Sequence, residues 1–163
     1  MERKTDISLI LVLPMALIET IHSCWKKRFH WHGVCIEANP LLFRILKRFR
    51  NVTCLNICSD AKEGLVDFVL RGELSGIVDS NLDNTRKNID IKQANIIKLK
   101  TSTLISILKE GKAPNVIDYL SLDVEGAEDR VLCGFPFEQY IFNCITVERP
   151  KPELISVLKK MVI

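Results

Sequence analysis

The chain has little glycine, no long apolar segment and none of the short sequences that mark several common enzyme classes. Seven of its 163 residues are glycine, and none precedes Gly33. The apolar stretch near the amino terminus, residues 7–18, is interrupted by Ser8 and Pro14. A bilayer span needs about 20 apolar residues, so we expect no membrane-spanning helix. The sequences G-x-S-x-G and G-x-x-x-x-G-K-[ST] are absent, which excludes a serine hydrolase of that type and a P-loop nucleotide hydrolase.

The chain also lacks a large excess of charge of either sign. The formal net charge is +3, with 23 basic against 20 acidic residues, and this bias is too weak to indicate nucleic-acid binding by itself. Basic residues do gather at 26–28 and on one side of a predicted helix over residues 40–50. Such a side is more often the solvated face of an amphipathic helix than an RNA-binding surface. We therefore expect no nucleic-acid partner and keep RNA binding as the weakest alternative.

The six cysteines form no C-x-x-C pair. Several lie in apolar runs, as Cys35 does between Val34 and Ile36, where a free thiol acts as a small apolar side chain. We expect reduced, structural thiols rather than a disulfide framework. His30 and His32 lie close to Cys35 in sequence, but the second pair of ligands that a zinc site needs is missing. The sequence therefore predicts no metal site.

The amino-terminal segment has the length of a secretory signal but not its pattern. Residues 2–6 carry no net positive charge, and no small-x-small cleavage sequence follows closely. We interpret residues 7–18 as a core strand that leads into a core helix. We expect a cytoplasmic protein, and the apolar start leaves the secretory pathway as the alternative.

Apolar runs with strand character alternate with segments of helical periodicity along the chain. At this length we expect one domain over residues 1–163, of the α/β class, with a mostly parallel sheet and helices on both faces. A long polar segment, residues 71–93, is typical of a lid or binding loop. The expected strands are 7–13, 34–37, 52–58, 65–70, 95–99, 116–122 and 142–147, and the expected helices are 15–29, 40–50, 101–108, 126–133 and 152–161.

Four of the expected strands end in acidic residues. These are Glu37, Asp60, Asp123 and Glu148, and in a parallel sheet they would gather along the edge where such folds bind their ligands. In such folds an acid at a typical distance in sequence after the first strand accepts hydrogen bonds from both ribose hydroxyls of a nucleotide. Glu37 lies at about that distance from the first expected strand, and a carboxylate can accept two hydrogen bonds at once. Asp123 and Glu125 follow a buried strand directly. They are candidates for the site or, about equally, acids that cap the next helix.

Four segments together resemble the FkbM-type S-adenosylmethionine-dependent methyltransferases. The segment Asp118–Glu128, with the sequence DYLSLDVEGAE, carries most of the resemblance, which covers residues 31–158. The other three are Gly33–Pro40, Ser75–Val78 and Ile145–Pro150. The resemblance implies a Rossmann-like methyltransferase fold, S-adenosylmethionine as cofactor, and a hydroxyl on a sugar or other small molecule as the methyl acceptor.

The resemblance also implies roles for single residues. Glu37 and Asn39 would bind the cofactor, Glu37 through its ribose hydroxyls, and Ser59 and Asp60 would lie beside the adenine. Asp123 and Glu125 would face the reactive end of the cofactor and the acceptor. Because a hydroxyl acceptor reacts faster beside a base, Asp123 is the first candidate for the catalytic base and Glu125 the second.

One feature of the family pattern is missing from residues 1–30. Family members have a glycine-rich loop after the first strand, whereas this chain reads Ser8–Met15 (SLILVLPM) at that place and has no glycine there. Close approach of backbone to a ligand usually needs glycine. We expect a divergent or truncated member, and an inactive methyltransferase-fold binding module is the alternative to an enzyme. A sheet edge left uncovered could pair with a second copy.

Overall fold

The computed structural model of the protein describes residues 8–12, 32–82, 84 and 94–160. Its first layer is a sheet of five parallel strands in the order β3-β2-β1-β8-β9. The strands are β1 (Ser8–Val12), β2 (His32–Ile36), β3 (Thr53–Leu55), β8 (Val116–Leu122) and β9 (Ile141–Val147). The order runs outward from β1 to β3 on one side and from β8 to β9 on the other, so it reverses at β1. Doubly wound α/β folds bind their ligands beside such a reversal.

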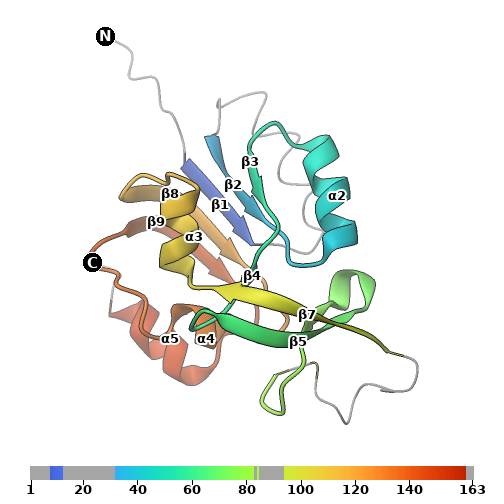
Figure 1. The fold of residues 1–163 in the computed structure, drawn as a ribbon. Coiled ribbons are helices and arrows are strands. Elements are labelled where there is room, and N and C mark those ends of the chain that lie inside the picture. The colour runs from blue at the N-terminus through green and yellow to red at the C-terminus, as the bar shows by residue number, and fades with distance from the viewer. Residues whose placement is uncertain (1–7, 13–31, 83, 85–93, 161–163) are drawn as a thin grey trace.

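A second, mixed sheet faces the carboxyl ends of these strands (Figure 1). Its strands lie in the order β4-β7-β5-β6, with β4 parallel to β7 and the other two pairs antiparallel. They are β4 (Cys58–Ser59), β5 (Gly64–Leu70), β6 (Gly76–Ile77) and β7 (Asn95–Ser102), and a single 3-10 turn, η2 (Gly72–Leu74), joins β5 to β6.

The second sheet corrects two expectations. The expected parallel sheet is present, but the expectation that it holds every strand was wrong, because β5 and β7 form a long antiparallel pair outside the parallel layer. A continuous third strand over residues 52–58 was also wrong, because it divides into β3 and β4, which belong to different sheets. The side chain of Asn56 marks the division. Its Nδ2 donates to the carbonyl oxygens of Glu37 (2.7 Å) and Ala38 (3.1 Å), so the link between β3 and β4 is held against the residues that follow β2.

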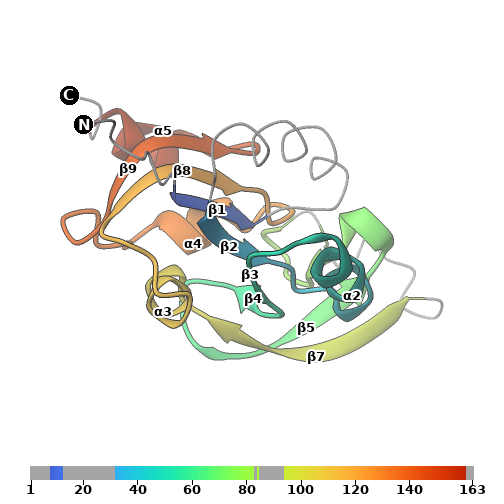
Figure 2. The same cartoon turned by 90° about the horizontal axis from the view of Figure 1, so that it is seen from above.

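The described helices are α2 (Pro40–Phe49), α3 (Leu104–Glu110), α4 (Glu128–Leu132) and α5 (Pro152–Lys159). Helix α2 lies beside β3 (Figure 2), and the other three supply apolar side chains to the main core against β2 and β8. Helix α3 starts later than expected: Thr101 and Ser102 belong to β7, and Thr103 is the N-cap, with its hydroxyl accepting from the Ser106 amide. The expected helix 15–29 lies outside the described residues.

Burial agrees with this layered arrangement. Leu104, Ile107, Leu120 and Leu132 are at most 1% exposed, as expected for side chains between helices and a sheet. A smaller core joins the second sheet to the turn after β8, with Phe68 and Ile77 packed near Ala127 and Val124. No helix within the described ranges is long and apolar enough to cross a membrane.

The described cysteines are free thiols, as the sequence predicts, but not all of them are buried. The five cysteines that the structure describes are all free thiols. Cys35 and Cys58 are buried, and burial raises the pKa of each thiol to about 12, so both behave as apolar side chains. Cys133 and Cys144 are exposed instead.

Candidate active site

Strand register brings three of the predicted acids to one edge of the parallel sheet. Val12 pairs with Ile36 on one side and with Leu122 on the other, so β2 and β8 end level with each other. Leu122 in turn pairs with Val147 of β9. The residues that follow, Glu37, Asp123 and Glu148, therefore share one edge. At about 4.8 Å per strand, Asp123 and Glu148 are neighbours, whereas Glu37 and Asp123 lie about 10 Å apart across β1.

Asp60, the fourth acid, does not belong to that edge. It follows β4 in the second sheet, and its carboxylate is bound from two sides by Arg130 of α4, with Nε–Oδ1 at 2.7 Å. The same guanidinium donates to Asp79 Oδ2 at 2.9 Å. Asp60 is 2% exposed. The bidentate pair fixes α4 to β4, and the bond to Asp79 joins α4 to the segment after β6.

A pocket lies between the edge of the parallel sheet and the second sheet. The pocket is partly open to solvent, and acidic, hydroxyl and apolar side chains all line it, as is typical of a small-molecule site. Four predicted site residues line it, whereas Asn39 and Asp60 do not. The lining residues are Ile36, Glu37, Ala38, Leu42, Ile57, Cys58, Ser59, Phe68, Gly72, Glu73, Ser75, Gly76, Ile77, Asp123, Val124 and Glu125.

Glu37 is held in a fixed position on the pocket wall. It is 9% exposed, and its Oε1 accepts from the Asn39 amide at 2.7 Å. Its own amide donates to the Leu55 carbonyl. Burial raises the pKa of Glu37 to about 7, although backbone hydrogen bonds from Asn39 and Ala38 oppose the rise. The carboxylate therefore retains acceptor capacity and would gain from donors on a ligand.

Asn39 acts on the pocket through a neighbour. Its Oδ1 accepts from the Leu41 amide at 3.0 Å and so caps α2, as the Asn-Pro pair predicted. Its Nδ2 donates to Ser75 Oγ at 2.9 Å, and Ser75 lines the pocket. Asn39 thus joins the start of α2 to the loop before β6, which makes it a positioning residue for that loop.

The loop before β6 approaches the turn after β8 closely. A Cβ on Gly76 would collide with Nδ2 of Asn84 and lie 3.1 Å from the Glu125 Cβ. Only glycine leaves that space open. Ser59 also lines the pocket, and its hydroxyl oxygen is buried without a hydrogen-bond partner. An orphaned polar atom in a pocket wall is the kind of group that a bound ligand satisfies.

Asp123 is the most perturbed acid at the sheet edge. Burial is the main cause that raises its pKa to about 8, followed by a hydrogen bond with Glu148 and by the charges of Glu148, Glu125 and Glu128. Burial alone would raise the pKa of Glu148 too, but its bonds with Asp123 and Arg149 lower it. Asp123 therefore keeps its proton more readily than Glu148 does.

Glu125 has an uncommon backbone conformation. Its φ is 54° and that of Gly126 is 93°; strain of this kind at a non-glycine residue is typical of functional sites. Arg149, with a φ of 47°, donates through Nη2 to Glu125 at 3.2 Å and to Glu148 at 2.9 Å. The capping alternative for the two acids was wrong, because Ala127 is the N-cap of α4 and no side chain caps it.

Sequence reasoning missed the partners that hold these acids. Arg130 lies 70 residues from Asp60 and Arg149 lies 24 from Glu125, so no local pattern connects them. The sequence predicts only a helix at Glu128, yet its Oε1 accepts from the amides of Val124 (3.0 Å) and Gly126 (3.3 Å) and holds the turn. An acid following Asp-x-Glu-Gly by two residues was the one available signal.

A model of the FkbM methyltransferase domain matches residues 15–159 of the chain. No curated protein and no solved structure matches it. The matched range contains β2, β8, β9 and every residue that lines the pocket. With this match over most of its length, the chain belongs to the FkbM methyltransferase domain family.

Proposed function

We propose that the protein transfers a methyl group from S-adenosylmethionine to a hydroxyl of a small-molecule or glycan acceptor. Methyltransferases of this family generally use that cofactor. The observation that carries the proposal is Glu37. It is a buried carboxylate held by Asn39 at the end of β2, on a pocket wall, and β1 separates it from Asp123 at the end of β8. A carboxylate there can accept two hydrogen bonds from a ribose diol.

The residues of the pocket match the parts of this cofactor. Leu42, Ile57, Phe68 and Ile77 provide an apolar wall for a planar base. Ser59, beside them, offers an unpartnered hydroxyl for its polar edge. The acidic lining residues, which include Glu73 as well as those at the strand ends, favour the positive charge of a sulfonium. Asp60 does not line the pocket and would act indirectly, by fixing β4 through its ion pair with Arg130.

Positioning and a base are what the protein's own residues would contribute. The cofactor supplies a methyl group on a positively charged sulfur, which an acceptor oxygen must approach in line. Asp123 and Glu125 lie where the parallel strands end beside the pocket. Asp123, with its raised pKa, would be a stronger base than an ordinary carboxylate once ionised. Glu125, fixed by Arg149, is the second candidate.

Calorimetric titration with S-adenosylmethionine and S-adenosylhomocysteine tests the cofactor site. We expect micromolar binding that Glu37→Ala weakens by about 1–3 kcal/mol, the cost of losing hydrogen bonds to a charged group. Glu138→Gln is the control, because Glu138 is exposed and does not line the pocket. Absence of binding at millimolar ligand in a folded sample, or equal weakening by both variants, would refute the proposed site.

The absence of glycine between β1 and Gly33 favours a second candidate, an inactive binding module. The two candidates differ in turnover. An enzyme releases S-adenosylhomocysteine when incubated with S-adenosylmethionine and hydroxyl-bearing acceptors, and Asp123→Asn lowers the rate by about 10²–10⁴-fold if Asp123 is the base. A module binds the cofactor with the same dependence on Glu37 but forms no product with any acceptor.

A further inference from the structure

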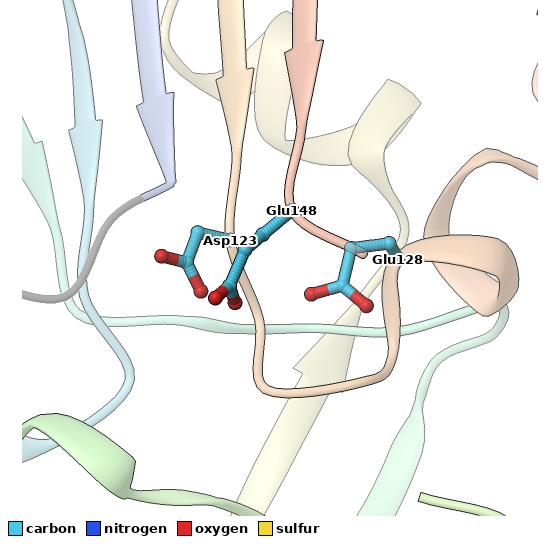
Figure 3. Close-up of side chains that lie close together, drawn as sticks. All are labelled: Asp123, Glu128 and Glu148. Carbon is cyan, nitrogen blue, oxygen red and sulfur yellow. The ribbon is translucent and has the colours of Figure 1, made fainter. Parts of the chain in front are cut away.

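Three carboxylates converge beside the pocket without enough partners to balance them. Figure 3 shows Asp123 and Glu148 side by side at the ends of β8 and β9, with Glu128 facing them from the start of α4. One oxygen of each lies within 4.8 Å of an oxygen of both others. Repulsion between like charges this close is strong when they are removed from water.

The hydrogen bonds of the cluster leave two oxygen atoms unused. Glu128 is 0% exposed, and while its Oε1 accepts from two backbone amides, its Oε2 is buried with no hydrogen-bond partner. Oδ1 of Asp123 is also buried without one. A buried carboxylate oxygen with no donor is costly to maintain. Both atoms are therefore available to a positive group, in addition to the hydrogen bond that Asp123 makes with Glu148.

The positive side chains near the cluster act at its rim. Arg149 contacts Glu148 and Glu125, and its side chain is 52% exposed. Lys151 lies 3.9 Å from Asp129, the neighbour of Glu128. None of these three ion pairs involves Asp123 or Glu128, whose unpartnered oxygens are buried.

We propose that Asp123, Glu128 and Glu148 bind a hard divalent cation such as Ca²⁺, Mn²⁺ or Mg²⁺. Such cations prefer carboxylate oxygens. Ligands on opposite sides of Ca²⁺ are about 4.6–5.2 Å apart and those of Mg²⁺ about 4.0–4.2 Å, twice the metal–oxygen distance. The three ligand oxygens lie no more than 4.8 Å from one another, a separation that two ligands of one Ca²⁺ ion can span, whereas a smaller cation requires the carboxylates to move closer together. The prediction of no metal site considered histidine and cysteine spacing, which does not detect a carboxylate cluster.

A cation at this position would also change the proposed roles in methyl transfer. The cation site itself does not depend on the proposed function. Where both hold, the cation would lie beside Asp123 on the pocket wall and could bind an acceptor oxygen and lower the pKa of its hydroxyl. Asp123 would then act as a ligand, and Glu125 would remain as the candidate base.

Mn²⁺ titration followed by electron paramagnetic resonance tests the site without any cofactor. Free Mn²⁺ gives the sharp signal, so its loss reports binding and stoichiometry. We expect one site per chain, with Ca²⁺ or Mg²⁺ competing, and at least about tenfold weaker binding in Asp123→Asn and in Glu148→Gln, since even groups that only support a ligand contribute that much. Asp118→Asn, within the strand β8 that ends just before Asp123, is the control and should bind as the wild type does.

Glu128→Gln provides a second, independent readout. The amide oxygen can still accept from Val124 and Gly126, while the buried charge is removed. We expect the variant to melt at a higher temperature than the wild type without cation and to gain no stability when Ca²⁺ is added, whereas the wild type gains. No Mn²⁺ binding at millimolar concentration, or binding that survives all three substitutions, would overturn the proposal. Neither result bears on cofactor binding, which is measured without metal.

Discussion

Proton release on cofactor binding follows directly from the burial of Glu37. Its pKa of about 7 means that about half of the molecules carry a protonated Glu37 at pH 7. A ribose diol donates hydrogen bonds and so requires the ionised form. Binding at pH 7 should therefore release about 0.5 proton from this residue. Between pH 8 and pH 6 the same requirement should weaken the affinity by about tenfold.

Calorimetry in buffers of different ionisation enthalpy measures this release. We expect Glu37→Gln to bind S-adenosylhomocysteine more weakly than the wild type at pH 8 and to release about 0.5 proton less at pH 7. Glu138→Gln should leave both quantities unchanged. An identical proton release in wild type and Glu37→Gln would refute the reasoning, because it would show that the bound ligand does not ionise Glu37.

The same shift makes a prediction about the unliganded protein. The folded-state pKa of Glu37, about 7, lies above the ordinary value of 4.5, so between these values the native state holds the proton more tightly than the unfolded chain does. The stabilising effect of neutral Glu37 is fully present below pH 4.5 and is lost as the pH rises through 7. It is worth up to about 3 kcal/mol. Urea denaturation across this pH range should show a larger loss in wild type than in Glu37→Gln, because the raised pKa of Asp123 contributes equally to both proteins and only the Glu37 contribution differs.

Three further substitutions test other contacts of the site. Arg130→Ala should lower the free energy of unfolding by about 3–5 kcal/mol, because it leaves the buried Asp60 carboxylate without its partner; a loss below about 1 kcal/mol in urea denaturation would show that the pair is not important. Gly76→Ala should destabilise the protein by about 1–3 kcal/mol and weaken cofactor binding, because the added Cβ collides with Asn84; unchanged calorimetry and melting would contradict that packing. Arg149→Gln should tighten Mn²⁺ binding severalfold by removing a positive charge bound to Glu148; weaker binding would indicate that Arg149 supports the cation site instead.

Local sequence signals predicted the bounds of a strand or helix where residues with strong conformational preferences mark its ends. The apolar run at 116–122, followed by acids and glycine, predicted β8 with its observed bounds. Asn39 and Pro40 predicted the start of α2, and the amphipathic pattern after them predicted its length to within one residue. The edge of acids followed from these strands because parallel register places residues after neighbouring strands side by side.

The rest depended on contacts between distant segments. The alternation at 65–70 predicts a strand but not its partner, so β5 was placed in the wrong sheet. The division between β3 and β4 follows from the hydrogen bond of Asn56 to the chain after β2. The residues next to Asn56 in sequence give no sign of this contact. Glu128 lies in a helix by sequence, and only the folded turn after β8 shows that its carboxylate faces Asp123 and Glu148.

The position of the bound cofactor tests the central claim most directly. Chemical-shift mapping of amide resonances during titration with S-adenosylhomocysteine would give it residue by residue. We expect shifts at Ile36–Ala38, Ile57–Ser59, Ser75–Ile77 and Asp123–Glu125, the segments that line the pocket. Shifts centred instead on the cavity at the opposite end of β2, beside His32, Thr53 and Lys112, would contradict the assignment of the pocket as the cofactor site.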